Sequence, residues 1–174
     1  EKESLNMSAA DLEKKITSKS KVLIIQHAFG FPADLEKLLA VAKKNNLFVI
    51  EDCAHALGAT HSTGSGQASK PVGTFGDAAF FSFGRDKVIS STFGSIATVK
   101  DAKIAAQVER LHQSFQMPTR GWIAKQLLHP IIMAKVKFSF RFPGFGKLHL
   151  YLLKKLGLTT PAVYPHEKTG GKPP

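Results

Sequence analysis

The feature that most constrains the fold is the order of three segments in the first third of the chain. Residues 21–26, KVLIIQ, form a short β-branched run that suits a strand covered on both faces, and residues 47–51, LFVIE, form a second one. Between them, PADLEKLLAVAKKNN repeats apolar residues at helical spacing, and Pro32 fits the first turn of such a helix. A strand, a helix and a strand in this order predict a βαβ unit.

The neighbouring segments extend the same pattern. Ser8 precedes apolar residues four apart and predicts a helix over 9–16, and Asp101 opens another that runs to about Leu111. Residues 78–83 and 95–99 are further strand candidates, whereas the Gly, Ser and Pro content of 61–77 predicts a loop. We therefore expect an α/β fold with a mostly parallel sheet that is flanked by helices.

Charge is unevenly distributed along the chain. Residues 1–110 hold 14 Lys and Arg against 12 Asp and Glu, whereas residues 111–174 hold 10 against the single acid Glu167. A balanced first part is typical of an enzyme domain, and a basic second part is typical of a surface that meets anions, lipid headgroups or a protein partner. We expect the division near residue 115, with domains at 1–115 and 116–174.

The cellular compartment is predicted from cysteine content and apolar runs. One cysteine in 174 residues cannot build a disulfide framework, and no basic N-terminal stretch precedes an apolar block. No apolar run approaches the roughly 20 residues that would span a bilayer. We expect a cytoplasmic protein that does not cross a membrane.

The basic region, 122–158, interleaves Leu, Ile and Phe with Lys and Arg, and Pro130 and Pro143 are predicted to break it into short pieces. It can lie peripherally on a membrane surface, or pack on the rest of the protein or on a second copy of it. No groove-reading motif is present, so nucleic acid is not an expected partner. The tail, 164–174, is predicted to be disordered. One helical piece is expected to place Lys147, Lys154 and Lys155 on one side and Leu148, Leu152 and Leu156 on another.

Polar side chains follow three of the predicted strands. His27 follows the first strand, Asp52 and His55 follow the second, and Ser82 and Lys87 follow the third. Ligands of open α/β sheets bind outside the carboxyl ends of the strands, so these residues are candidates for one site. Each also has a structural interpretation as a turn cap, a hydrogen-bonded histidine or a solvated lysine. No pair has the helical i, i+4 spacing of metal ligands, and no metal is expected.

Two stretches resemble a known family. Residues 24–59, IIQHAFGFPADLEKLLAVAKKNNLFVIEDCAHALGA, and residues 72–87, VGTFGDAAFFSFGRDK, resemble the middle of the large domain of the DegT/StrS-type sugar aminotransferases. These are fold-type-I enzymes that depend on pyridoxal 5'-phosphate (PLP). The resemblance extends from about Leu5 to about Phe115. It implies that 1–115 is part of a PLP-dependent large domain and that the chain is a fragment of a longer product.

The resemblance assigns a role to four residues. It implies that Lys87 is the catalytic lysine that forms a Schiff base with the cofactor aldehyde. Asp52 would pair with the pyridine nitrogen and keep it protonated, so that the ring can accept electrons. His55 would lie near the ring and its phenolic oxygen, and the hydroxyl of Ser82 would donate to the phosphate.

The resemblance also implies a reaction and partners. An amino-acid donor, usually glutamate in the family, would supply the amino group, and a keto group on a nucleotide-linked sugar would accept it. Family active sites lie at a homodimer interface, which implies a homodimer here. The alternative is a noncatalytic relative whose basic C-terminal region binds a membrane surface or a protein partner.

Overall fold

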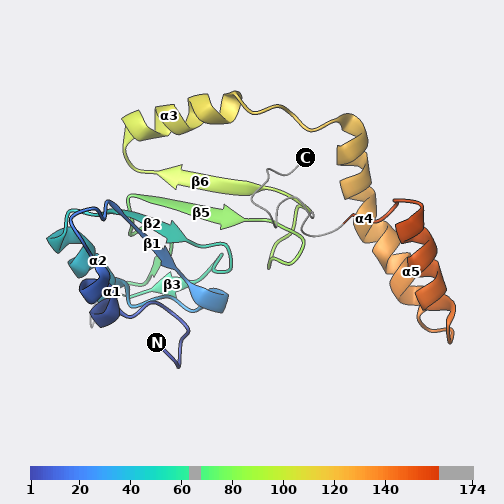
Figure 1. Cartoon of the computed structure of the whole chain (residues 1–174), viewed down its shortest axis with the longest axis horizontal. Helices are drawn as coiled ribbons and strands as arrows, with labels where there is room; N and C mark the ends of the chain where they lie inside the picture. The colour runs from blue at the N-terminus through green and yellow to red at the C-terminus, as the bar shows by residue number, and fades with distance from the viewer. Residues whose placement is uncertain (63–67, 161–174) are drawn as a thin grey trace. The chain divides into compact units, whose positions relative to one another are not determined.

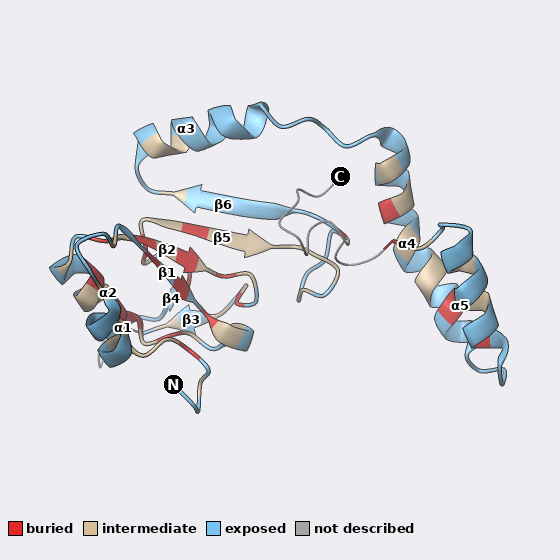
Figure 2. Ribbon diagram, viewed as in Figure 1, coloured by how far each residue is buried: buried red, intermediate tan, exposed pale blue. Residues whose placement is uncertain are grey.

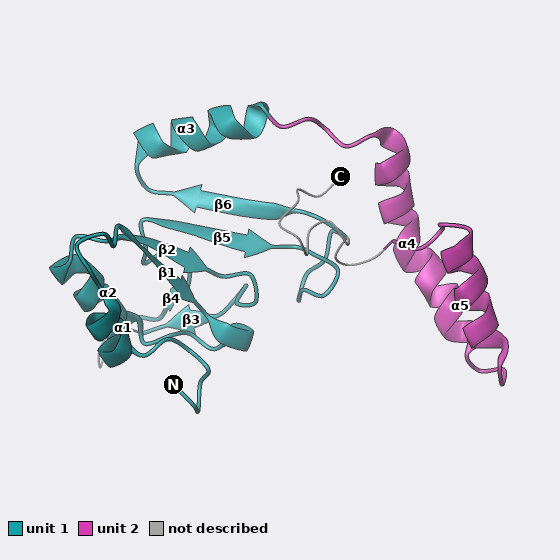
Figure 3. Ribbon diagram, viewed as in Figure 1, with its two compact units in different colours: residues 1–114 teal, residues 115–174 magenta. Residues whose placement is uncertain are grey.

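The computed structural model describes residues 1–62 and 68–160 and divides the chain into two compact units, 1–114 and 115–174 (Figure 3). The predicted disordered tail, 164–174, lies outside the described residues. Unit 1 holds a short 3-10 turn at Ala28–Gly30, three helices and six strands within its described residues. Its elements are α1 (Ala9–Lys15), β1 (Val22–Gln26), α2 (Leu35–Lys44), β2 (Phe48–Asp52), β3 (Thr60–His61), β4 (Lys70–Pro71), β5 (Ala78–Ser82), β6 (Ser95–Val99) and α3 (Ala102–Gln113).

The main sheet of unit 1 has four strands in the order β1-β2-β5-β6. Strands β1, β2 and β5 are parallel, and β6 pairs with β5 in the antiparallel direction (Figure 1). The helix α2 connects β1 to β2, as the order of segments in the sequence predicts. The expectation of an α/β fold with a mostly parallel sheet is confirmed.

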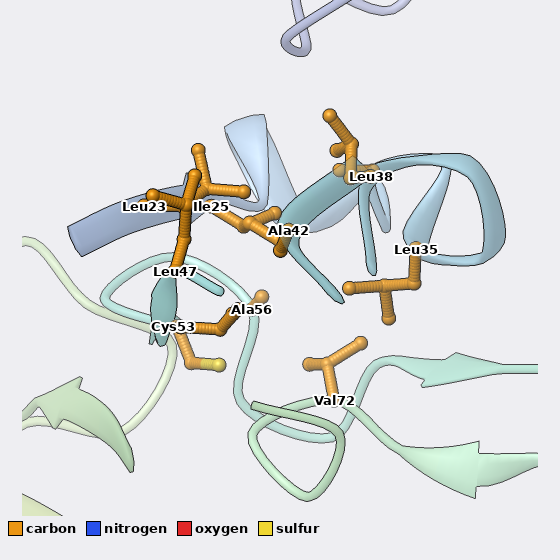
Figure 4. Packing of buried hydrophobic residues seen from close by; sticks show 11 residues of the cluster. Leu23, Ile25, Leu35, Leu38, Ala42, Leu47, Cys53, Ala56 and Val72 are labelled. Atoms are coloured by element: carbon orange, nitrogen blue, oxygen red, sulfur yellow. The ribbon is translucent and has the colours of Figure 1, made fainter. Parts of the chain in front are cut away.

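One face of this sheet carries the core. Leu23 and Ile25 of β1 and Val49 of β2 pack with Leu35 and Leu38 of α2, and all five side chains are buried. Figure 4 shows part of this cluster, and Figure 2 shows the buried residues gathered on β1, β2 and α2. Alternation along each strand sends the intervening residues to the other face, where apolar side chains are exposed. The exposed side chains include Val22 at 51% and Ile24 at 53%.

The start of α2 differs from the prediction. Pro32 was expected in the first helical turn, but α2 begins at Leu35, and Asp34 is its N-cap. The carboxylate of Asp34 accepts a hydrogen bond from the Lys37 backbone N–H at 3.2 Å. An Asp side chain satisfies an otherwise unpaired helical N–H, which explains why the helix begins after it.

The segment 61–77 is not entirely a loop, because β3 and β4 form a two-stranded antiparallel pair at its start. Thr60 pairs with Pro71, and His61 pairs with Lys70. Residues 63–67, between these strands, lie outside the described residues. The Gly, Ser and Pro content predicted a loop, but composition does not encode which residues pair. The pairing depends on two segments of the chain that meet in space.

Unit 2 contains two described helices, α4 (Arg120–Ser139) and α5 (Phe145–Lys155). Most of the described residues of this unit are helical, but Pro130 does not break the region as predicted, because α4 continues through this proline. Pro143 does lie in the turn between the two helices. Within residues 1–62 and 68–160, no helix combines the length and apolar character that crossing a bilayer requires.

Candidate active site

Two of the predicted site residues lie on one face of the sheet. Asp52 pairs with Gln26 of β1 and with Phe80 of β5. Ser82 is two residues beyond Phe80 in the same strand, and the side chains of residues i and i+2 point to the same face. Asp52 and Ser82 therefore lie on the sheet face opposite the buried core, at the carboxyl ends of β2 and β5.

A direct contact joins the other two predicted residues. Lys87 Nζ lies 2.9 Å from His55 Nε2, although the residues are 32 positions apart in the sequence. With the ammonium as donor, Nε2 is the acceptor and the imidazole carries its proton on Nδ1. The Lys87 side chain is only 13% exposed, so the amine is held at the edge of the unit rather than in open solvent.

The loop that carries Lys87 is closed by backbone hydrogen bonds. The N–H of Phe83 donates to Gly94 O at 2.9 Å, and the N–H of Ser91 donates to Phe83 O at 3.0 Å. Inside this loop the N–H of Lys87 donates to Gly84 O at 3.1 Å, and the N–H of Gly84 donates to Ser82 Oγ at 3.3 Å. The loop therefore fixes the backbone of the lysine close to the hydroxyl of Ser82.

Asp86 is the acidic neighbour of the amine. Its carboxylate lies 3.4 Å from Lys87 Nζ and is 74% exposed. A hydrogen bond with its own backbone N–H, followed by the attraction of Lys87, holds the pKa of Asp86 below its usual range. Because Asp86 faces solvent, water screens the attraction between its carboxylate and the Lys87 ammonium.

Asp52 also has the structural role that Asp residues at strand ends commonly take. Its Oδ1 accepts a hydrogen bond from the Ala54 backbone N–H at 3.0 Å, which shapes the turn that leads to His55. This contact engages one carboxylate oxygen, and Asp52 is half-buried. The turn and the candidate site thus share one side chain.

His27 does not join the site, although it follows a strand at the same edge. Its ring is fully buried, Nδ1 accepts from the Ala33 backbone N–H at 3.1 Å, and Nε2 lies 3.1 Å from Glu51 Oε2. An accepting Nδ1 leaves the proton on Nε2, so the ring is neutral and donates to Glu51. His27 is a hydrogen-bonded core residue.

Glu51 is the residue that sequence reasoning missed. Its fully buried carboxylate accepts from His27 and from the backbone N–H groups of Gly73 at 2.8 Å, Phe75 at 2.7 Å and Gly76 at 2.6 Å. Burial raises the pKa of Glu51, but these four donors outweigh it and hold the pKa below its usual value. The only sequence signal was an acid at the end of the apolar run LFVIE, residues 47–51.

Glu51, His27 and Cys53 place three potential metal ligands within 4.8 Å of one another. Both imidazole nitrogens and both carboxylate oxygens already make the hydrogen bonds described above. Burial, followed by the charges of Glu51 and Asp52, raises the pKa of the Cys53 thiol to about 12, so the thiolate that a metal needs is strongly disfavoured. The cluster joins strands and loop through hydrogen bonds.

Comparison with known proteins identifies the family. GDP-perosamine synthase of Escherichia coli O157:H7 is 42% identical over 99 residues, which are 57% of this chain and 26% of that protein. The aminotransferase of Psychrobacter cryohalolentis superposes with a TM-score of 0.57 at 25% identity and covers 68% of this chain and 31% of its own. The PLP form of Spr1654 from Streptococcus pneumoniae gives 0.52 at 28% identity, with 63% and 30% covered.

The chain spans only part of such proteins, between 23% and 40% of the length of eight curated relatives. Residues 1–129 match the profile of the DegT/DnrJ/EryC1/StrS aminotransferases, which is well over half of the 174 residues. The chain therefore belongs to the DegT/DnrJ/EryC1/StrS aminotransferase family.

Proposed function

We propose that residues 1–115 are the central part of the large domain of a PLP-dependent enzyme that transfers an amino group to a keto group of a nucleotide-linked sugar. The observation that carries this proposal is the 2.9 Å contact between Lys87 and His55, beside a sheet face that bears both Asp52 and Ser82. An amine, an acid and a hydroxyl at one edge are the groups that a small phosphorylated heterocycle requires.

Enzymes of this family use PLP, which supplies an aldehyde for covalent attachment and a ring that withdraws electrons from carbon. The residues present fit this cofactor. Lys87 would attach it, Asp52 would hold a proton on its pyridine nitrogen, and Ser82 would donate to its phosphate. His55 accepts the hydrogen bond of Lys87 Nζ, so it can orient the amine and take up its proton.

The relatives support a substrate class. Besides GDP-perosamine synthase, they include a transaminase of dTDP-3-amino-3,6-dideoxy-α-D-galactopyranose and a 3-aminotransferase of a UDP-linked glucosamine derivative. We propose a nucleotide-linked sugar as acceptor and an amino acid, glutamate, as donor. A homodimer in the cytoplasm is part of the same proposal. We propose the activity for the whole protein, because the curated relatives are longer than this chain.

Covalent trapping tests the lysine. After incubation with PLP and reduction with borohydride, peptide mapping is expected to find the cofactor on Lys87, because this amine is the one held beside His55 and the sheet edge. Lys87→Ala should lose the specific adduct. The matched variant Lys103→Ala, which removes an exposed lysine of α3, should keep it.

Two outcomes would contradict the proposal: a reducible adduct of equal yield in Lys87→Ala, or label spread over exposed lysines in the unchanged chain. Either result would favour the alternative of a noncatalytic relative. Asp52→Asn adds a spectroscopic readout, because loss of the carboxylate should shift the absorbance band of bound PLP as the ring nitrogen loses its proton.

A further inference from the structure

The helical hairpin of unit 2, residues 120–155, has an unusual distribution of polar and apolar side chains. Its buried positions include Gln126, Ser139 and Gly146 beside a single large aliphatic residue, Val136. Ser139 Oγ lies 3.1 Å from His149 Nδ1 across the two helices. A Cβ at Gly146 would lie 2.5 Å from Phe140 Cγ, so the helices meet through a small residue.

Most of the large apolar side chains of the same hairpin point outward, whereas Ile132, Met133, Leu150 and Leu153 are half-buried. Ten of them are between 46% and 61% exposed, which is unusual for large apolar side chains on a helix that faces water. They are Leu127, Leu128, Ile131, Phe138, Phe140, Phe142, Phe145, Leu148, Tyr151 and Leu152. Small and hydrogen-bonding residues thus lie between the helices, and most of the large apolar residues lie outside. This arrangement is typical of helices that are surrounded by lipid.

Charge selects the kind of surface. The hairpin carries eight cations and no Asp or Glu, and the sequence has no acid at all between residues 111 and 160. The cations are Arg120, Lys125, Lys135, Lys137, Arg141, Lys147, Lys154 and Lys155. Basic and apolar side chains together match an anionic bilayer, whose headgroups take the cations while its acyl boundary takes the apolar groups.

The turn between the helices concentrates both features. Phe138, Phe142 and Phe145 are exposed there, the rings of Phe138 and Phe142 are 6.3 Å apart, and the guanidinium of Arg141 lies 5.5 Å from the centre of the Phe138 ring. Aromatic rings beside cations are favoured at the depth where headgroups meet acyl chains. Neither helix is long and apolar enough to span the bilayer, so the hairpin would lie in one leaflet.

We propose that the hairpin docks this protein on an anionic phospholipid surface, with the turn at 138–145 inserted among the lipids. The proposal is independent of the PLP site, because it uses none of the residues assigned there. It selects the lipid alternative for the basic region over a protein partner.

The sequence contains one tryptophan, Trp122, and it lies in α4, so its fluorescence reports on the hairpin. The full chain is mixed with phosphatidylcholine vesicles that contain about 30% phosphatidylglycerol, at low salt. Trp122 emission is expected to shift to the blue and to be quenched by spin-labelled lipid, and the chain should sediment with the vesicles. Pure phosphatidylcholine vesicles, or about 0.5 M salt, should weaken binding strongly, because the attraction to headgroups is screened.

Two hairpin variants separate the contributions. Lys147→Gln, Lys154→Gln and Lys155→Gln together should weaken partitioning roughly 100-fold, and Phe142→Ser with Phe145→Ser should abolish the quenching by spin-labelled lipid. The matched controls in unit 1 change exposed residues of the same kinds: Lys14, Lys19 and Lys21 to Gln, or Leu5 and Phe31 to Ser. Both controls should bind as the unchanged chain does.

Absence of vesicle binding by the unchanged chain at low salt would overturn the proposal without needing any variant. Binding that the unit 1 controls reduce as much as the hairpin variants do would also overturn it. Self-association through the hairpin without vesicle binding would assign the surface to a second copy instead. Formation of the Lys87 adduct in the hairpin variants keeps this test distinct from that of the proposed function.

Discussion

At Glu51, one buried carboxylate connects strand β1, through His27, with the loop 73–76. The next residue, Asp52, points to the opposite face and is the proposed partner of the cofactor ring. The position of Asp52 along β2 therefore depends on a neighbour whose own side chain never reaches the site. Gly73 shows how closely this loop approaches, because a Cβ there would lie 2.5 Å from Phe81 Cζ, and its φ is +87°.

Glu51→Gln is expected to lower the free energy of unfolding by about 3 kcal/mol, because an amide group brings N–H donors to a place where four donors need acceptors. Urea unfolding measures this loss. The control Glu36→Gln changes an exposed residue in the first turn of α2 and should alter stability by less than about 0.5 kcal/mol. Equal effects of the two substitutions would contradict the assigned role of Glu51.

The same carboxylate predicts a pH dependence. Since the pKa of Glu51 is lower in the folded state than in the unfolded chain, the unfolded state takes up its proton first as the pH falls. Its contribution to stability is therefore complete above the usual Glu pKa and is lost as the pH falls through the folded-state pKa. Unfolding curves measured between neutral and acidic pH should show this loss in the unchanged chain and a flatter dependence in Glu51→Gln.

At the scale of elements, α2 is defined by its cap and its buried stripe. Asp34 caps the helix and pairs with Lys37 Nζ at 2.7 Å, and this lysine is the main reason that the pKa of Asp34 is lowered. Asp34→Ala should cost about 1 kcal/mol, because a backbone N–H of the first turn loses its acceptor. Chemical denaturation measures the cost, and Lys37→Ala, which keeps the cap but removes the exposed ion pair, should cost clearly less.

At the scale of the whole molecule, the two faces of the sheet are not equivalent. Ile25 is fully buried against α2, whereas its neighbour Ile24 is 53% exposed on the other face. Parallel sheets are generally covered on both faces.

Two neighbouring substitutions measure this asymmetry. Ile25→Ala should destabilise unit 1 by about 3 kcal/mol, because it leaves a cavity in the core. Ile24→Ala should change the free energy of unfolding by less than about 0.5 kcal/mol in the chain as it stands. A loss at Ile24 as large as that at Ile25 would mean that another surface covers this face in solution.

The amino-acid sequence by itself determined the elements, because apolar periodicity is a local property that folding preserves. The residue types in 24–59 and 72–87 indicated the family, and the comparison with known proteins confirmed it. The sequence also predicted the βαβ unit and the mostly parallel sheet, and it shows the charge difference between residues 1–110 and 111–174. The assignment of roles to Lys87, Asp52, His55 and Ser82 stays a prediction.

Only the tertiary structure decided which polar residues meet. The contact of Lys87 with His55 and the burial of His27 against Glu51 join residues that are 24 or more positions apart, and no local pattern encodes such pairs. The continuation of α4 through Pro130 and the exposure of its apolar residues were likewise not visible in the sequence. Burial depends on what the rest of the chain brings against a side chain, and that is a property of the fold.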